Sequence, residues 1–247
     1  MDLSPTYQSN FKFIFSPIVS DEFLLKFLLW KPDVKRASDR FRILQKWRED
    51  NPWAHTNLKL SQDEKLKKLV ASNVVIVPGS IVTRNGSAVL VGRLRFNDMT
   101  DGRTPEDVCR MLFYMIDRAL ESKAAQEHGI VVFHDLKDLS KSNIHPNIPK
   151  LLFKAIIGTL PLKIKGIYLL NAPFFFKGFF TMISSLLLPK KVKERVHYVN
   201  SIEDVHTIID KDLLLVEHGG MLEYNADAWI QTQIQREESG DWTSVLL

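Results

Sequence analysis

Two pairings of an acidic residue with histidine are the parts of this sequence whose residue types could support acid–base chemistry. His134-Asp135 and the Glu-Asp-x-His segment at residues 203–206 each place a carboxylate beside an imidazole, as general acid–base catalysis requires. Adjacency along a chain does not make a site, and the sequence contains no Gly-x-Ser-x-Gly, glycine-rich phosphate loop or His-Glu-x-x-His. The single cysteine, Cys109, falls in an expected helix and cannot form a zinc cluster alone. We therefore expect no enzyme, no catalytic residue, no metal site and no cofactor.

Basic residues are concentrated between residues 163 and 195, where Glu194 is the only acid. The formal net charge of the whole chain is only +4, which is too small to indicate nucleic-acid binding. A run of charge is often just a solvated face, but near an anionic membrane each cation contributes about 1 kcal/mol to binding. A membrane-facing patch is therefore one interpretation of Lys163, Lys165, Lys177, Lys190, Lys191, Lys193 and Arg195.

Residues 174–188, Phe-Phe-Phe-Lys-Gly-Phe-Phe-Thr-Met-Ile-Ser-Ser-Leu-Leu-Leu, are apolar almost all round when wound as a helix. A helix of this kind is usually buried in a core on every side. The alternative is a helix that covers an enclosed apolar ligand and, after moving outward, offers its aromatic side chains to a bilayer interface. The basic residues on either side of the segment favour this second interpretation. They also lack the aromatic-interleaved β-face that would favour nucleic acid.

The elements expected around this segment are those of an α/β fold. Residues 1–72 read as a small helical domain, with residues 1–20 as a possible irregular arm, and residues 73–247 read as alternating strands and helices around a mostly parallel sheet. The expected strands are Val74 to Val77, Ala88 to Phe96, Ile130 to His134, Ile167 to Leu170 and Val196 to Val199. The expected helices include one opened by a Ser61-to-Glu64 capping box and a crossover at residues 149–160, and the acidic tail after Gly220 reads as a solvated helical end.

The sequence also bears on localisation. Its nearly uncharged apolar stretch at residues 178–189 is shorter than the roughly 20 apolar residues that span a bilayer. The N-terminus lacks the basic start and the cleavage site of a signal peptide. We therefore expect a cytoplasmic protein that associates peripherally with endomembranes.

An ordered set of motifs resembles the CRAL-TRIO lipid-binding family, particularly its tocopherol-transfer and retinaldehyde-binding members. The resemblance extends roughly from Phe23 to Gly220 and includes segments 23–27, 46–48, 51–52, 130–135, 161–173, 191–196 and the Glu-His-Gly-Gly at 217–220. It implies an N-terminal helical domain and an α/β domain that encloses a lipid pocket, with residues 174–188 as a mobile gate. It also implies that a basic cleft beside the gate binds phosphatidylinositol phosphates, at the matching positions Arg48, Lys163, Lys165, Lys191 and Arg195.

The sequence departs from the family pattern at several positions. Leu162 stands where phosphatidylinositol-holding members use a glutamate, Phe96 stands where tocopherol carriers have a polar pocket residue, and Leu29-Trp30-Lys31 replaces the usual basic triplet. The identity of the ligand therefore stays open among tocopherol, retinoid and phospholipid classes. The residues expected to line the pocket are Phe96, Leu112, Phe113, Met115, Ile116, Phe133, Leu152, Phe153, Ile156, Leu169, Phe175, Phe179, Met182, Ile183 and Leu187.

Two functions fit these features. The first is a carrier that holds one hydrophobic molecule under the gate and moves it between membranes, docking through the basic patch. The second is a phosphoinositide-sensing or adaptor module that transfers no cargo. The same motifs would serve both, because the two differ only in whether the pocket fills and empties.

Overall fold

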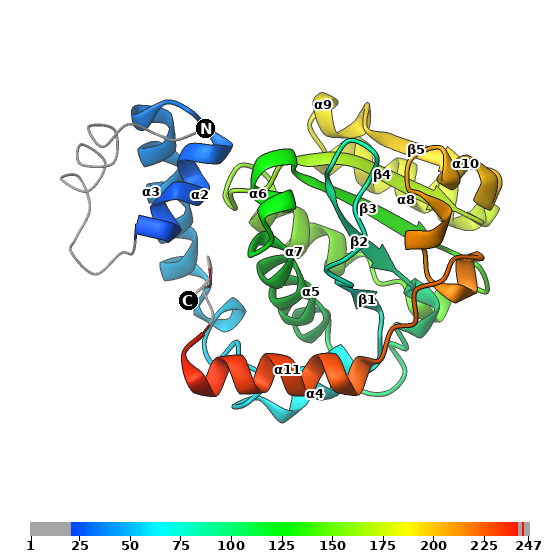
Figure 1. The fold of residues 1–247 in the computed structure, drawn as a ribbon, viewed down its shortest axis with the longest axis horizontal. Helices are drawn as coiled ribbons and strands as arrows, with labels where there is room; N and C mark the ends of the chain where they lie inside the picture. The colour runs from blue at the N-terminus through cyan, green and yellow to red at the C-terminus, as the bar shows by residue number, and fades with distance from the viewer. Residues whose placement is uncertain (1–20, 242–243, 245–247) are drawn as a thin grey trace.

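A five-stranded sheet forms the centre of the structure (Figure 1). The computed structural model describes residues 21–241 and Ser244, so the arm expected at residues 1–20 lies outside the described residues. The sheet has the order β1-β2-β3-β4-β5, in which β1 is antiparallel to β2 and the other neighbours are parallel. The predicted α/β class with a mostly parallel sheet is therefore confirmed. The strands are β1 (Val75–Ile76), β2 (Ala88–Gly92), β3 (Ile130–Asp135), β4 (Ile164–Leu170) and β5 (Val196–Val199).

The second strand is shorter than the sequence pattern predicts. It ends at Gly92 and is followed by a 3₁₀ turn, η2 (Leu94–Phe96), so the prediction of a strand to Phe96 is wrong. The physical reason is an ion-pair cluster: Arg93 and Arg95 both bend toward Glu217, with N–O distances of 3.0 and 2.6 Å. These ion pairs turn the chain away from the direction of β2, and the side chain of Phe96 is 41% exposed.

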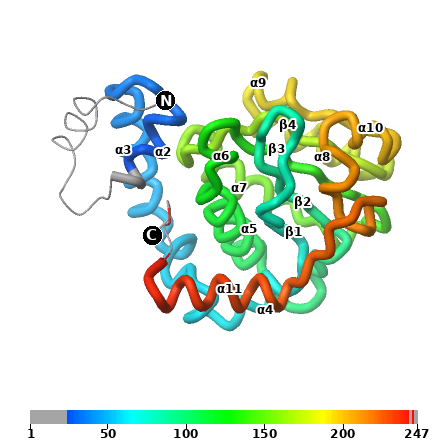
Figure 2. The backbone as a smooth tube through the Cα atoms, in the orientation of Figure 1, coloured from blue at the N-terminus to red at the C-terminus, as the bar shows by residue number. Residues whose placement is uncertain are grey.

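The helices surround this sheet, and the tube in Figure 2 shows their path. Local capping explains several of their starts. The side chain of Asp33 accepts a hydrogen bond from the Arg36 amide, and Thr104 makes a reciprocal capping box with Asp107. The helices are α2 (Asp21–Trp30), α3 (Val34–Asp50), α4 (Glu64–Ala71), α5 (Pro105–Leu120), α6 (Lys123–His128), α7 (Asn147–Ile156), α8 (Phe174–Leu187), α9 (Lys190–Lys193), α10 (Ile202–His206) and α11 (Ala226–Ser239).

The start of α4 corrects one prediction. Asp63 caps this helix, because its carboxylate accepts a hydrogen bond from the Leu66 amide at 2.9 Å. The box predicted from Ser61 to Glu64 does not form, since Glu64 is already the first helical residue and the Ser61 amide donates to Glu237 instead.

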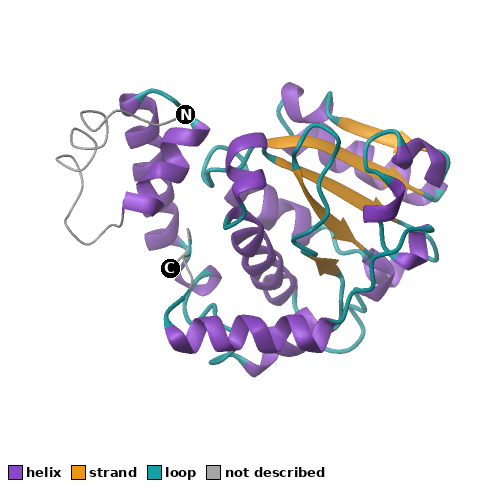
Figure 3. Cartoon of the chain, viewed as in Figure 1, coloured by secondary structure: helices purple, strands orange, loops and turns teal. Residues whose placement is uncertain are grey.

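Helices lie on both sides of the sheet (Figure 3), and the two faces differ in their side-chain packing. On one face, side chains such as Val91 and Val131 pack directly against Val205 of α10 and Leu214 of a later turn in a closed apolar cluster. The other face is turned toward α5, α7 and α8, and its packing leaves space. Adjacent residues of a strand point to opposite faces, so each strand contributes to both layers.

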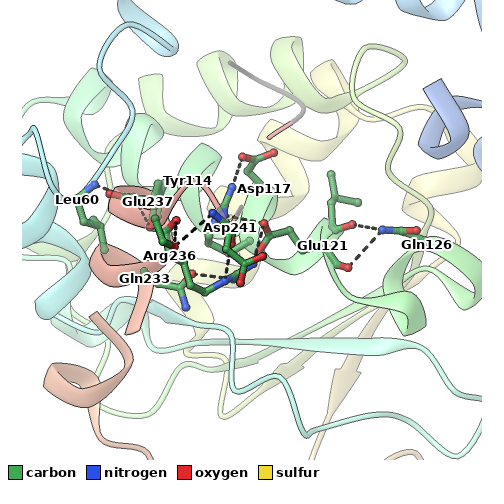
Figure 4. Close-up of polar contacts among 12 residues, drawn as sticks. Leu60, Tyr114, Asp117, Glu121, Gln126, Gln233, Arg236, Glu237 and Asp241 are labelled. Atoms are coloured by element: carbon green, nitrogen blue, oxygen red, sulfur yellow. Dashed lines mark hydrogen bonds and ion pairs between the residues drawn. The ribbon is translucent and has the colours of Figure 1, made fainter. Parts of the chain in front are cut away.

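Helix α11 packs the C-terminal end of the described chain against α4 and the residues just before it. It lies beside α4, although the two are separated by more than half the chain (Figure 2). The carboxylate of Glu237 accepts hydrogen bonds from the amides of Leu60 and Ser61 and from the hydroxyl of Tyr114 (Figure 4). The helical end expected after Gly220 therefore forms, but the burial of Glu237 shows that one side of it is not solvated.

Candidate functional site

A cavity of about 200 Å³ lies between the sheet and helices α5, α7 and α8. Strands β2, β3 and β4 contribute one wall, and residues from the segments 94–97 and 143–149 also line it. Its lining is almost entirely aliphatic and aromatic, and none of the described residues around it carries a permanent charge. Such a space favours an apolar guest, because water in it would find few hydrogen-bonding partners.

Strand alternation decides which sheet residues reach the cavity. Val132 and His134 of β3 line it, whereas Phe133 between them points to the opposite face and stacks edge-on against His218, with ring centroids 4.9 Å apart. On β4 the residues that line the cavity are Ile164, Ile167 and Leu169. This period of two places Phe133 outside the cavity.

The predicted pocket residues separate into two groups. Those that line the cavity are Leu112, Ile116, Leu152, Phe153, Ile156, Leu169, Phe179 and Ile183. Those that the structure places elsewhere are Phe96, Phe113, Met115, Phe133, Phe175, Met182 and Leu187.

Helical geometry accounts for the residues of α5 that lie elsewhere. Leu112 and Ile116, four residues apart, share the face of α5 that is turned to the cavity. Phe113 and Met115 are buried on other faces of the same helix. Phe113 packs against Trp47 and Trp53, at centroid distances of 5.6 and 6.1 Å.

Helix α8 covers the cavity with one face and exposes apolar side chains on another. The cavity-facing residues recur at spacings of three and four, as one helical face requires: Phe176, Phe179, Phe180 and Ile183. Away from the cavity, Phe174 is 92% exposed, Leu186 74% and Met182 52%. Phe176 and Phe180 are missing from the expected pocket, although the spacing from Phe179 and Ile183 would have indicated them.

In the structure, Asp135 and Asp204 of the two acid–histidine pairs have other partners. His134 faces the cavity, while Asp135 points to the other side of the strand and lies 3.4 Å from His218 Nε2 and 2.8 Å from the Asn171 amide nitrogen. Burial opposes ionisation of Asp135, but the contacts with His218 and Asn171 prevail and lower its pKa to about 2. In the second pair, Asp204 is occupied in capping α10.

His134 is the unusual polar residue of the cavity. Enclosure by protein lowers its pKa to about 4, so its ring is neutral at pH 7. Its Nδ1 has no hydrogen-bond partner of normal geometry among the described residues. By contrast, Asn97 and Asn143, which also border the cavity, bond each other's backbones and hold the two end turns together.

The depressed pKa of His134 predicts a loss of stability in acid. The unfolded chain binds a proton below the ordinary histidine pKa of about 6.5, whereas the native ring binds one only below about 4. Protonation therefore favours unfolding as the pH falls through this window, and we expect His134 to contribute about 2 kcal/mol of the decrease between pH 7 and 4.5. Urea unfolding of the wild type and His134→Leu at both pH values measures this contribution as the difference in their pH dependence. Equal pH dependence in the two proteins would contradict it.

The basic residues meet at the edge of the sheet where β4 and β5 begin. Lys163 and Lys165 flank the start of β4, and the guanidinium of Arg195, just before β5, donates to the Ile164 carbonyl. Burial lowers the pKa of Lys163, and the nearby charges of Lys165 and Lys31 lower it further. Several cations are thus crowded here, and Lys163, Lys165 and Lys31 make no ion pair among the described residues, an arrangement that suits an anion.

Two further predicted basic residues differ in their placement. Lys191 is exposed on α9, four residues before Arg195 in the chain. Arg48 lies near the end of α3, where burial lowers its pKa and the carboxylate of Asp117 opposes that effect. Lys31 precedes α3, so about 20 Å of helix separates it from Arg48. The structure therefore brings Lys31, which is not among the predicted residues, near Lys163, and places Arg48 near Asp117.

No helix within residues 21–241 has both the length and the apolar character needed to cross a membrane. In the same part of the chain, histidine, cysteine and acidic side chains form no group of three that could hold a metal ion.

Comparison with known proteins gives the family. The model of the CRAL/TRIO domain matches residues 72–220. Human alpha-tocopherol transfer protein-like is 27% identical over 209 residues, which cover 83% of this chain and 60% of that protein. Rat tyrosine-protein phosphatase non-receptor type 9 is 25% identical over 206 residues, covering 83% of this chain but only 34% of the phosphatase. The chain therefore spans between about a third and three fifths of the length of these relatives.

A solved structure shows the same architecture. The crystal structure of Sfh5 superimposes with a TM-score of 0.59 at 14% identity, covering 90% of this chain and 82% of that one. This likeness concerns the fold alone. The match to the domain model, which covers more than half of the chain, shows that the chain belongs to the CRAL/TRIO domain family, whose members bind hydrophobic ligands.

Proposed function

We propose that this protein is a non-catalytic carrier that encloses one hydrophobic molecule and moves it between membranes. The observation that carries the proposal is the cavity beneath α8, a helix that is apolar on the cavity side and exposes Phe174, Met182 and Leu186 on the outside. A helix with two apolar faces can seal a guest in water and contact a bilayer when it opens. The part before residue 73 would act as a separate helical domain beside the carrier domain.

The size of the cavity bears on the guest. About 200 Å³ is below the range of roughly 300–1,000 Å³ typical of ligand pockets. A compact hydrophobe fits the closed form, and an outward movement of α8 would make room for larger guests. Tocopherol and retinoid classes are consistent with this enclosure, and the name of the human relative supports the former.

Transfer experiments with vesicles distinguish a carrier from a phosphoinositide sensor that transfers no cargo. Donor vesicles loaded with a fluorescent tocopherol analogue are mixed with unlabelled acceptor vesicles and catalytic amounts of protein. A carrier accelerates appearance of the label in acceptor vesicles in proportion to protein concentration. Saturable binding of the analogue without any acceleration would instead support the phosphoinositide-sensing alternative.

The basic patch of Lys31, Lys163, Lys165, Lys191 and Arg195 is proposed to bind phosphoinositide headgroups at a cytoplasmic membrane surface. We expect the double variant Lys165→Ala/Lys191→Ala to bind phosphoinositide-containing vesicles about 10- to 30-fold more weakly, since each cation contributes about 1 kcal/mol. Both side chains are exposed, so the affinity for ligand should stay unchanged. Vesicle co-sedimentation measures the first quantity and fluorescence titration the second.

The matched control removes two exposed lysines elsewhere, in Lys68→Ala/Lys211→Ala. It has the same net charge as the patch variant, so it isolates the effect of position from that of total charge. Equal loss of vesicle binding in the two double variants would count against a localised headgroup site.

A further inference from the structure

We infer that Tyr198, on the last strand β5, positions helix α8 over the cavity and thereby sets the rate at which a guest enters and leaves. The inference deepens the proposed carrier function and rests on it. It concerns the step that limits exchange of the guest, which is the outward movement of α8.

Strand register turns Tyr198 toward the face of the sheet that α8 covers. Tyr198 pairs with Leu169 of β4, and Leu169 lines the cavity. Paired residues of neighbouring strands point to the same face, so Tyr198 lies on the cavity side of β5. The preceding residue, His197, points to the other face and stacks on Tyr168 at a centroid distance of 5.0 Å. Because β5 is the last strand in the sheet order, Tyr198 lies at the sheet edge beside α8.

Two side chains on consecutive turns of α8 contact Tyr198. The ammonium nitrogen of Lys177 lies 5.5 Å from the centroid of its ring, within the range of a cation–π interaction. Thr181 lies beside the phenol: burial raises the pKa of Tyr198, and the side chain of Thr181 opposes that effect. The Thr181 hydroxyl also donates to the Lys177 carbonyl at 2.7 Å. Tyr198 is therefore in contact with one flank of α8 at two points along the helix.

These contacts matter because the sequence of α8 gives the helix little stability of its own. Its N-cap is Pro173, whose side chain makes no hydrogen bond to the first turn. Gly178 faces open space in the middle of the helix, and glycine is one of the weakest helix formers. On the other flank, Met182 and Leu186 are exposed, and the inner side borders the cavity. The flank that meets Tyr198 therefore contributes a large share of what holds α8 closed.

The location of these contacts determines which quantity they control. Lys177, Thr181 and Tyr198 do not line the cavity, so a guest does not touch them. They therefore stabilise the closed form equally with and without a guest. Weakening them raises the population of the open form in both states. Association and dissociation then become faster by the same factor, while the dissociation constant stays the same.

Stopped-flow fluorescence of the full chain with 2-methylnaphthalene, a compact apolar probe, measures both rate constants. We expect Tyr198→Leu to raise each of them about fivefold, with a dissociation constant within about twofold of the wild-type value. Lys177→Met should raise both about threefold, and adding it to Tyr198→Leu should give no further increase, because the two side chains share one contact. Tyr198→Phe keeps the ring beside Lys177 and should have a smaller effect than Tyr198→Leu.

His197→Leu is the matched control, because this exposed residue of β5 points to the other face of the sheet and should leave both rate constants unchanged. Thermal melting checks that each variant is folded. Unchanged rate constants in folded Tyr198→Leu, even with a lower melting temperature, overturn the positioning role while the carrier stands. A faster dissociation alone overturns it too, since that result indicates contact with the guest. Failure of 2-methylnaphthalene to bind the wild type overturns both.

Discussion

Phe179→Asp is expected to abolish retention of a hydrophobic ligand and to remove most lipid transfer. Phe179 lines the cavity from the inner face of α8, and its ring lies 6.3 Å from that of Phe176. A carboxylate at this position would lose its hydration in an apolar space with no described cation in the lining. We expect 2-methylnaphthalene to bind at least about 100-fold more weakly, a difference of roughly 3 kcal/mol.

Two positions on the same helix make this test specific. Met182→Asp changes the exposed side of α8 and should impair transfer to acceptor vesicles while ligand affinity stays near the wild-type value. Ser185→Asp adds the same charge at an exposed polar position and should alter ligand affinity little. If Phe179→Asp and Ser185→Asp bind the probe equally well, α8 is not the cover of the site.

Glu237→Ala is expected to destabilise the fold by about 3–5 kcal/mol, the second large effect. The buried carboxylate accepts hydrogen bonds from the Leu60 amide at 3.1 Å, the Ser61 amide at 2.9 Å and the Tyr114 hydroxyl at 2.7 Å (Figure 4). Removing one acceptor leaves three donors without their partner in a place that water reaches poorly. Burial, reinforced by the bond to Glu237, raises the pKa of Tyr114, so the hydroxyl remains a donor at every physiological pH.

Urea denaturation at pH 7 measures the change in the free energy of unfolding. Glu238→Ala is the matched control, because this neighbour is exposed and its loss should change stability by no more than about 0.5 kcal/mol. Similar values for the two variants would show that Glu237 does not hold α11 against α4 and α5. The loss of stability in Glu237→Gln should lie between those of Glu237→Ala and Glu238→Ala, since the amide oxygen can still accept some of the three hydrogen bonds.

Much of the fold follows from local patterns. Apolar runs of four to seven residues separated by helical periodicity indicate β3, β4 and β5, and the threonine–proline start indicates α5. Helix α8 can also be predicted from the sequence, because few helices are apolar around so much of their circumference. These features depend on interactions between residues that are close in the sequence, so the local sequence is enough to predict them.

The errors have a common cause, which is dependence on distant partners. Phe96 leaves the strand because Arg93 and Arg95 meet Glu217, more than a hundred residues away. Phe133 is apolar, as a pocket residue should be, yet the position of the strand relative to α10 turns it to the filled face. Residue type gives no information about which of two apolar faces a strand residue occupies.

The sequence by itself determined the α/β class, the lipophilic cover and the basic stretch before β5, because periodicity and composition are local properties. Only the tertiary structure decided that one face of the sheet is hollow, that Lys31 joins Lys163, and that His134 faces Gly92 inside the hollow. Each of these depends on strand register or helix packing between segments far apart in the chain. The free energy that fixes such contacts comes from the whole fold, and no single segment specifies it.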